Sequence, residues 1–592
     1  MGIRHLYTNL RPYASPTTLD PGTEIFIDGP GLAHYVYDQC LRASASQSPP
    51  ADTNPWDSAI SYSALQDGVI KYLHMLESCG AKIAKIYFDG ALPASKRPTR
   101  ISRLEELLRK LCKFHASYAH TLPRCADRSA RLEVFSEKAV YAPASSPLPA
   151  PPFLVVATLE ALSRGGYADR TSTVPGEAEG YAARDAIAAG GVVLTSDSDL
   201  LLFRGEGGGD WGVVMLKDLE VNFSTRKIST VLFRPDDIAK GFGLELAFLG
   251  YLSRCEPYTS FSALRERCVQ IAERGKGGAS VEEMGWKWQE FAAGYALPEG
   301  DGGRLLDPRI GEVLSLRGSV GRKKEMFLPV LWEDTSRASA WDVCRGVRVL
   351  AYSVLFPGDM SLEEISRRGH GISGTPVEIF PAKEVKRKLQ AIISESQEKD
   401  WQARYILQQI AKTFATRNQP PPHTSILESS ASLLSGGNNP TTGKEPASAR
   451  WTWERIQTFA MLQAAWYSLL LLSEVLKETT GSEIALGILP VEMLDGRCFV
   501  DARPGAGDRA LVGEVLLEYF GREEDEKDTE EYMEEGAGAE ERNSKEADRE
   551  GVWKEVGGKA RNARKKGRGP MEETEVEVAG VGGRNIFAAL VG

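Results

Sequence analysis

Three short apolar runs, each closed by an aspartate, constrain the fold of this chain more than any other feature. They span residues 24–28, 85–89 and 192–197 and end in Asp28, Asp89 and Asp197. Continuous apolar runs of this length are typical of parallel strands that are covered on both faces. Helical patterns lie between them, for example at 101–111, where leucines recur three and four residues apart. This alternation of strand and helix predicts an α/β domain with a mostly parallel sheet.

Carboxylates follow the predicted strands at four places in the chain: Asp28, Asp89, Glu177 with Glu179, and Asp197 with Asp199. Because the carboxyl ends of parallel strands line one crevice, we expect these side chains to converge. Carboxylates that lie close together raise one another's pKa and need protons or cations to coexist. Oxygen ligands without His or Cys favour Mg²⁺ or Mn²⁺, and a pair of such ions is suited to phosphodiester hydrolysis. Taken singly, however, each acid is typical of a turn or of a helix N-terminus.

Basic side chains follow Asp89 and lead into the helical pattern at 101–111. They are Lys96, Arg97, Arg100 and Arg103. Two interpretations are open for this group. Next to an acidic site, the cations are suited to holding a scissile phosphate and steering a nucleic-acid strand. Alternatively, they form the solvated face of a helix.

The chain of 592 residues is long enough for several domains. Its net charge of -10 comes mostly from an acidic block at 522–550, so any nucleic-acid surface must be a local basic patch. The predicted parts are an α/β domain at 1–255, a helical region at 256–418, a polar linker at 419–450, a C-terminal helical unit at 451–520, a disordered tail, acidic and then basic, at 521–584, and a short apolar terminal segment at 585–592.

The sequence also predicts where the protein resides. The N-terminus lacks the layout of a signal peptide, and the eight cysteines show neither zinc-site nor redox-pair spacing. The apolar stretch at 459–476 contains Gln463, Ser468, Ser473 and Glu474, which favours a buried core helix over a membrane span. We therefore expect a protein of the nucleus or cytoplasm that is not secreted and has no membrane partner.

Taken together, the motifs resemble those of the flap endonuclease/XPG nuclease superfamily, which has a PIN-like fold. In chain order they are Met1-Gly2-Ile3, Ile27-Asp28-Gly29, Phe88-Asp89-Gly90, Pro175-Gly176-Glu177-Ala178-Glu179 and Ser196-Asp197-Ser198-Asp199. The resemblance covers about residues 1–205. The divergent remainder and the long helical C-terminal region are most similar to the Asteroid group of this superfamily.

The resemblance implies a fold and a set of functional residues. The fold is a twisted, mostly parallel α/β sheet of the PIN-like/XPG type with flanking helices, followed by a largely α-helical C-terminal region and a disordered charged tail. The cofactor is Mg²⁺ or Mn²⁺, as two ions. The corresponding positions are Asp28, Asp89, Glu177 and Glu179 for one metal set, Asp197 and Asp199 for the other, and Lys96 and Arg103 for the basic residues that activate the phosphate.

The chain departs from the family pattern at a seventh acid. Leu252 stands at that place, and Glu256 reaches it only if a small insertion is allowed. The glycine-rich helix-two-turn-helix with which the family grips duplex DNA is not recognisable at 257–273. The expected consequences are a weakly held second ion and an altered grip on double-stranded DNA.

Two functional hypotheses result. The first is a divalent-metal-dependent, structure-specific endonuclease that hydrolyses phosphodiester bonds of structured or single-stranded DNA, with reduced activity and a role in DNA repair in the nucleus. The second is a catalytically degenerate XPG-like scaffold that binds RNA or protein partners. The retained acids favour the enzyme, whereas the missing seventh acid favours the scaffold.

Overall fold

The structure is a computed structural model that describes residues 3–47, 55–56, 59–119, 132–205, 210–275, 285–300, 303–317, 324–358, 362–435, 451–480, 486, 488–494 and 504–520. The chain divides into one unit at Met1–Tyr519 and a second at Phe520–Gly592. The tail predicted at 521–584 and the apolar segment predicted at 585–592 lie outside the described residues. The other domain boundaries stay predictions.

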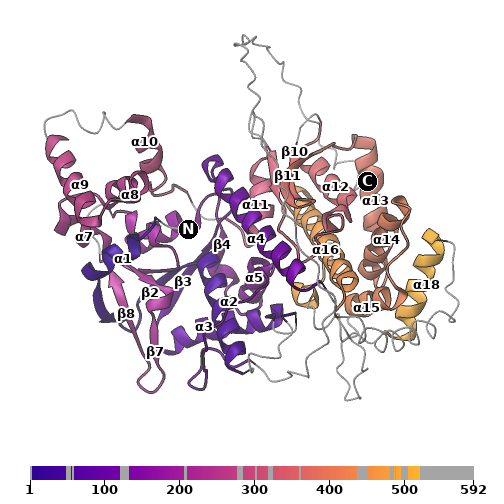
Figure 1. Ribbon diagram of the computed structural model, residues 1–592, viewed down its shortest axis with the longest axis horizontal. Helices are drawn as coiled ribbons and strands as arrows, with labels where there is room; N and C mark the ends of the chain where they lie inside the picture. Colours follow the sequence, from indigo (N-terminus) through magenta and orange to yellow (C-terminus); the bar gives the residue numbers. More distant parts are fainter. Residues whose placement is uncertain are drawn as a thin grey trace, which may run out of the picture. The chain divides into compact units, whose positions relative to one another are not determined.

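An eight-stranded sheet forms the centre of the N-terminal half (Figure 1). Its strands are β1 (Ser15–Thr18), β2 (Glu24–Asp28), β3 (Lys82–Phe88), β4 (Thr171–Thr173), β5 (Val192–Thr195), β6 (Gly212–Met215), β7 (Glu220–Asn222) and β8 (Lys227–Phe233). They lie in the order β1-β8-β6-β5-β2-β3-β4, with β7 paired to β8. The strands β4, β3, β2, β5 and β6 are parallel neighbours, whereas β8 pairs antiparallel with β1, β6 and β7. The predicted α/β class with a mostly parallel sheet is confirmed.

The predicted strands occur, but two of them end before the aspartate that was expected to close them. Asp89 and Asp197 lie just beyond β3 and β5, and each carboxylate accepts a backbone hydrogen bond from the first turn of a helix. The N–H of Ala178 donates to Asp89 at 2.9 Å, and the N–H of Asp199 donates to Asp197 at 3.0 Å. The acids therefore belong to the turns that join strand to helix.

Helices of the N-terminal half lie on both faces of this sheet and beside it. They are α1 (Leu6–Leu10), α2 (Gly29–Ser46), α3 (Tyr62–Ser78), α4 (Arg97–Ser117), α5 (Leu154–Arg164), α6 (Ala178–Ala189), α7 (Pro235–Phe242), α8 (Leu246–Cys255), α9 (Phe261–Gly275) and α10 (Gly285–Ala293). Phe26 and Val193 share a core with Ala182 of α6, while Ile27, next to Phe26, is equally buried. Because side chains alternate along a strand, Ile27 points to the other face, where α2 and α3 pack.

The C-terminal half is largely helical, as predicted. Its helices are α11 (Pro308–Ser315), α12 (Arg345–Leu355), α13 (Ala382–Glu395), α14 (Trp401–Thr416), α15 (Thr424–Leu434), α16 (Trp453–Thr480) and α18 (Ala506–Phe520). Helix α15 lies inside the range predicted as a linker. Its serine-rich sequence suggested a linker, but Ile426, Leu427 and Leu433 are buried, and the helix packs on α14 and α16.

A small sheet within the region predicted as helical was not expected. It has the order β11-β10-β9, with strands β9 (Lys324–Phe327), β10 (Leu362–Arg368) and β11 (Gly371–Val377). Strand β10 is rich in charged residues, which concealed it in the sequence. Its Glu364 and Arg367 are nevertheless each 1% exposed, because Glu364 pairs with Arg348 at 2.6 Å and Arg367 pairs with Glu333 at 2.5 Å.

Helix α16 is the core helix of the C-terminal half. Among the described helices it is the one long and apolar enough to cross a membrane, yet most of that stretch is buried within the protein. It packs against α12, α14 and α15 (Figure 1). The structure therefore agrees with the prediction of a buried core helix at 459–476.

Candidate active site

The predicted acids meet at the carboxyl edge of the parallel strands. Asp28 ends β2, Asp89 follows β3, Asp197 follows β5, and Glu177 and Glu179 lie at the start of α6. The negative charges of Asp89 and Asp197 act on Asp28, and those of Asp28, Asp89 and Asp197 act on Glu179. Segments separated by more than a hundred residues thus form one acidic cluster, which we define as these five acids together with Asp199.

Asp28 is the most buried acid of the cluster, at 5% exposure. Its Oδ2 accepts a hydrogen bond from Thr195 Oγ1 at 2.8 Å, and its Oδ1 accepts one from the Gly31 N–H at 3.3 Å. Burial raises its pKa to about 7, and the charge of Asp89 adds to that rise. Gly31 is required here, because a Cβ at this position would lie 2.5 Å from Asp28 Oδ2.

Asp89 is held against the first turn of α6. Its Oδ1 accepts the hydrogen bond from the Ala178 N–H, at the end of the helix where the dipole favours negative charge. Burial still raises the pKa of Asp89, and the charge of Glu177 acts in the same direction. The next residue is Gly90, and a Cβ there would lie 2.0 Å from the carbonyl oxygen of Val174. The Asp-Gly pair is therefore both a turn and part of the cluster.

Asp197 and Asp199 are fixed by short backbone contacts. Asp197 donates its N–H to Thr195 Oγ1 at 2.9 Å, and the N–H of Ile3 donates to Asp199 Oδ1 at 2.6 Å. Burial raises the pKa of Asp199 to about 6, and the charge of Asp197 adds to the effect. The N-terminal motif thus reaches the site through Ile3, while Gly2 lies outside the described residues.

The two glutamates at the start of α6 differ in their environment. Glu177 forms an ion pair with Lys96, with 2.8 Å between Oε1 and Nζ. Burial raises the pKa of Glu179 well above its usual value, and the charges of Asp197 and Asp28 act in the same direction. A cation beside the cluster would oppose this rise in the pKa of Glu179.

The four basic residues after Asp89 divide into two pairs. The positive charges of Lys96 and Arg103 oppose the rise that burial causes in the pKa of Asp89, so both lie near the cluster. Arg97 and Arg100 instead pair with acids of the C-terminal half, with distances of 2.7 Å to Glu325 and 2.6 Å to Glu312. Two of the four residues that were predicted to hold a phosphate, Arg97 and Arg100, thus have a structural role.

The place of the family's seventh acid contributes no carboxylate. Leu252 belongs to α8, and its side chain is buried in the hydrophobic core. Glu256 follows α8 and pairs with Arg267 of α9 at 2.7 Å, while Thr259 donates to it at 3.3 Å. Glu256 is therefore engaged by α9, away from the charges that shift the pKa values of the cluster.

Two residues of the site were missed by sequence reasoning. Thr195 connects Asp28 to the backbone of Asp197, and its place at the end of a predicted strand was a usable signal. Tyr295 follows α10, and burial followed by the charges of Asp199 and Glu179 raises the pKa of its hydroxyl. It lies far along the chain in a segment without a recognisable motif, so the sequence gave no signal for it.

The donor set of the cluster fits a hard divalent cation. All six side chains are carboxylates, and four of them have raised pKa values, so the site needs protons or positive charge. Within the described part of the chain, no group of three or more His, Cys, Asp or Glu side chains is placed so that it could hold a metal ion. The six side chains thus have the chemistry of Mg²⁺ or Mn²⁺ ligands, but they are not arranged around one ion.

The sequence of this chain is similar to those of known proteins. A family profile described as "XPG domain containing" matches residues 150–379. The chain is 23% identical over 370 residues to Asteroid homolog 1 of Schizosaccharomyces pombe, a match that covers 60% of this chain and 60% of that protein. These findings confirm the resemblance to the XPG nucleases and to the Asteroid group.

Two solved structures are also similar to this chain. Both are described as the catalytic core of Rad2 in complex with DNA substrate. For complex III the TM-score is 0.27 at 15% identity, covering 51% of this chain and 83% of that one. For complex II the TM-score is 0.25 at 14% identity, covering 54% and 95%.

Proposed function

We propose that this chain is an XPG-type phosphodiesterase that uses divalent cations to cut structured or single-stranded DNA. The observation that carries the proposal is the convergence of the acidic cluster, in which burial and mutual repulsion raise the pKa values of Asp28, Glu179 and Asp199. A protein retains such a cluster at a cost in stability, which bound cations offset. Perturbed carboxylates at the carboxyl edge of an α/β sheet are typical of a functional site.

The carboxylates divide into two sets of proposed ligands. The residues that would hold Mg²⁺ or Mn²⁺ are Asp28, Asp89, Glu177 and Glu179 for the first ion and Asp197 and Asp199 for a weakly held second one. When bound, such ions supply activation of water and neutralisation of phosphate charge. The leucine at position 252 is the reason to expect weaker binding of the second ion.

The chain's own residues have three further tasks. Lys96 and Arg103 bring positive charge to the edge of the cluster, where they would hold a phosphate of the substrate. Thr195 fixes the orientation of Asp28 by donating a hydrogen bond to it. The burial of Asp28 keeps bulk water from its carboxylate.

A nuclease assay tests the proposal. Flap, overhang and single-stranded DNA oligonucleotides are incubated with the purified chain in Mg²⁺ or Mn²⁺, alongside the variant Asp197→Asn. We expect cutting that falls at least a hundredfold in the variant, since removing one oriented charge at a reacting centre costs about this much. Cutting that persists unchanged in Asp197→Asn would point to a contaminating enzyme.

The matched control is Asp185→Asn. Asp185 belongs to α6, the helix that carries Glu179, but it pairs with Arg184 at 2.7 Å and accepts a hydrogen bond from Tyr87. Its charge acts on these two residues. The control variant should therefore cut at the rate of the unmodified chain.

A second candidate function is a scaffold of the XPG fold that binds RNA or a protein without cutting. Leu252 in the core and the engagement of Arg97 and Arg100 by Glu325 and Glu312 favour it. The same assay separates the two candidates, because the scaffold leaves the oligonucleotides uncut in either cation. The expected role in DNA repair and the location in the nucleus or cytoplasm are part of the first proposal and depend on its outcome.

A further inference from the structure

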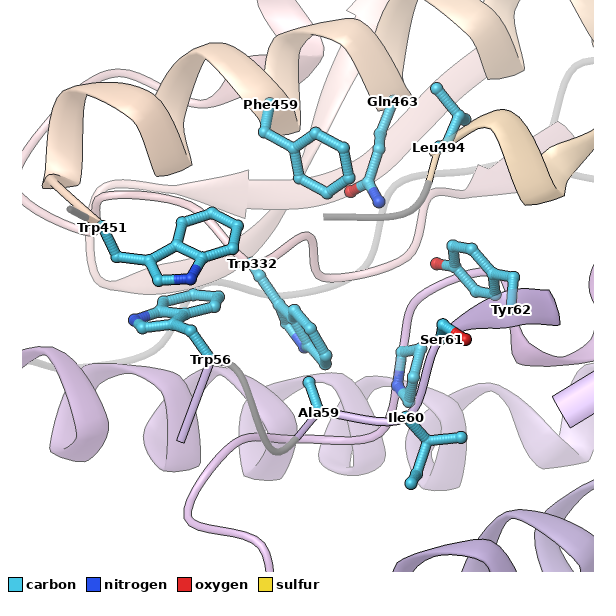
Figure 2. Close-up of a pocket in the computed structure, with 11 residues that line it drawn as sticks. Trp56, Ala59, Ile60, Ser61, Tyr62, Trp332, Trp451, Phe459, Gln463 and Leu494 are labelled. Atoms are coloured by element: carbon cyan, nitrogen blue, oxygen red, sulfur yellow. The ribbon is translucent and has the colours of Figure 1, made fainter. Parts of the chain in front are cut away.

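A polar group without a hydrogen-bond partner indicates a place where a protein can hold a ligand, but the space around the group decides what fits. Among the described residues, Gln463 Oε1 and Trp332 Nε1 are such groups, and both residues line the cavity between the segment before α3 and helix α16 (Figure 2). That cavity has a volume of about 40 Å³, which is room for about two or three waters. The hydroxyl of Tyr295 is different, because it lies beside the acidic cluster.

The ring of Tyr295 is fixed by two aromatic contacts. It meets Phe203 edge to face with 5.5 Å between the ring centroids, and its centroid lies 5.0 Å from that of Phe291 on α10. Phe203 directly follows the short 3₁₀ helix that carries Asp199. The ring is therefore held between α10 and the segment that supplies Asp199 to the cluster.

The segment that carries Tyr295 also packs on the first turns of α6. A Cβ at Gly180, the residue after Glu179, would lie 3.1 Å from Pro298 Cδ. The carbonyl oxygen of Pro298 accepts a hydrogen bond from Arg184 Nη1 at 3.4 Å. Contacts to α6 thus hold the segment beside the helix that contributes Glu179.

The hydroxyl of Tyr295 lies within the negative field of the cluster. Burial raises its pKa, and the charges that add most to this rise are those of Asp199, Glu179, Asp197 and Glu177, in that order. Within the described part of the chain, the hydroxyl nevertheless has no hydrogen-bond partner. Because its pKa is raised, the hydroxyl keeps its proton at neutral pH, and its O–H is left to donate to a bound group.

A hydrogen-bond donor at this place is suited to a phosphate. Ionised carboxylates are acceptors and cannot bond a phosphate oxygen, which is itself an acceptor. A phosphate beside the cluster therefore needs donors from other residues. Lys96 and Arg103 supply them near Asp89, and Tyr295 supplies one near Asp199.

We propose that the Tyr295 hydroxyl donates a hydrogen bond to a phosphate oxygen of the DNA strand that binds at the acidic cluster. The inference deepens the proposed function, and it rests on the part of that function that brings a DNA phosphate to these carboxylates. It adds a substrate contact from a segment outside the motifs that predicted the cluster. Hydrogen bonds to a charged acceptor are stronger than those between neutral groups, so the loss of this one is measurable.

Tyr295→Phe tests the contact, because it keeps the ring against Phe203 and removes the hydroxyl. Fluorescence anisotropy measures the affinity for a single-stranded DNA oligonucleotide with Ca²⁺ as the cation, so that binding is read apart from cutting. We expect the affinity to fall about tenfold, the factor that corresponds to one hydrogen bond to a charged group. Tyr251→Phe is the matched control and should bind like the unmodified chain. Tyr251 also packs on Phe291, at 5.4 Å, but its hydroxyl interacts with Cys255.

Oligonucleotides with one neutral methylphosphonate linkage each identify the contacted phosphate. At one linkage, the replacement should weaken binding to the unmodified chain and have about tenfold less effect in Tyr295→Phe, as in a double-mutant cycle. The effects at the other linkages should be the same in both proteins. If Tyr295→Phe weakens all oligonucleotides by one common factor, the tyrosine has only a structural role and the proposal is overturned.

The affinity for Mn²⁺ separates a contact to the substrate from an effect on the carboxylates. It should be equal in Tyr295→Phe and in the unmodified chain, because the hydroxyl is assigned to the phosphate. Mn²⁺ affinity that falls as much as the affinity for DNA would overturn the proposal, since Tyr295 would then act on the cation site.

The combined results distinguish a failure of this inference from a failure of the proposed function. If the unmodified chain cuts DNA, Asp197→Asn does not, and Tyr295→Phe binds and cuts like the unmodified chain, the tyrosine contact is wrong and the proposed function stands. If the unmodified chain neither binds nor cuts the oligonucleotides, both are overturned. Binding without cutting that is weaker in Tyr295→Phe at one linkage supports the contact and contradicts the hydrolysis.

Discussion

Burial determines the chemistry of Asp28, Glu179 and Asp199. Each accepts charge-stabilising contacts or lies near a helix N-terminus, yet the pKa of Asp28 is raised to about 7 and that of Asp199 to about 6. Loss of hydration therefore outweighs the hydrogen bonds and the helix dipole. The protons that occupy these carboxyls in the absence of a cation must leave when a cation binds.

The raised pKa of Asp28 predicts a stability that falls as pH rises. Between its ordinary pKa of 3.8 and its folded value of about 7, the folded chain binds more protons than the unfolded chain. Each pKa unit is about 1.4 kcal/mol, so the loss is on the order of 4 kcal/mol between pH 4 and pH 7. Asp28→Asn should remove this contribution from the pH slope of thermal melts without divalent cation and leave those of Glu179 and Asp199, whereas Asp185→Asn should keep all of them. An equal slope in Asp28→Asn would contradict the assignment.

Thr195 offers a second test at this scale. Thr195→Val removes the donor to Asp28 and the acceptor of the Asp197 N–H, and we expect a loss of about 1–3 kcal/mol in the free energy of unfolding. Thr195→Ser keeps the hydroxyl and should recover most of that loss. Urea unfolding of the three proteins measures the difference, and equal stability of Val and Ser variants would show that the hydroxyl is dispensable.

Helix α4 illustrates how an element can differ from its expected role. The resemblance gave it basic residues for a substrate strand, but the structure anchors it to the small sheet and α11. Arg100 pairs with Glu312 through two nitrogens and lies 3.7 Å above the ring of Phe327, and Leu108 and Leu111 share a core with Val330. Arg103 on α4 and Lys96 just before the helix lie near the acidic cluster, and they are the basic residues of this segment that are left for a substrate.

The anchoring of α4 predicts the effect of Arg100→Met. This change removes the partly buried ion pair and should speed hydrogen exchange of the α4 amides, by a local destabilisation of about 1–3 kcal/mol. Arg109→Met, at an exposed position of the same helix, is the control and should leave the exchange unchanged. Exchange in Arg100→Met as slow as in the unmodified chain would indicate that the leucine core alone holds the helix.

The features that could be predicted from the sequence are those whose signal lies within a short segment of the chain. Strand ends, the Pro-Gly-Glu-Ala-Glu turn and the Asp-Ser-Asp pair lie within short segments, so the parallel sheet and the convergence of its acids could be predicted. Tyr295 and the β9–β11 sheet could not, because their environments are created by distant segments. Strand β10 is the plainest case, since only the fold shows that Glu364 and Arg348 neutralise each other.

That buried pair connects three elements of the C-terminal half. Arg348 of α12 contacts both oxygens of Glu364 on β10 and donates to Ser468 of α16 at 3.0 Å. Burial raises the pKa of Glu364, but the charge and hydrogen bonds of Arg348 outweigh it and lower the pKa overall. The Arg348 side chain thus joins α12 to β10 and α16, although it has almost no exposure to water.

Removing Arg348 should destabilise the molecule strongly. Arg348→Met leaves Glu364 charged and buried without the cation that pairs with it, although the Tyr352 hydroxyl still donates to it at 3.0 Å, and we expect a loss of about 3–5 kcal/mol in the free energy of unfolding. The double variant Arg348→Met, Glu364→Leu removes both charges and should recover most of that loss. Chemical denaturation of the single and double variants measures the coupling. A double variant no more stable than the single one would contradict this account.

Binding of Mn²⁺, followed by electron paramagnetic resonance, tests the central claim most directly, because it reads the acidic cluster without requiring a substrate. We predict that the chain binds Mn²⁺, more tightly at pH 7.5 than at pH 6 because Asp28 and Asp199 must lose their protons. Glu179→Gln and Asp197→Asn should weaken binding at least tenfold, and Asp185→Asn should not. Absence of binding at millimolar Mn²⁺, or equal affinity in all these variants, would contradict a cation site at the carboxyl edge of the sheet.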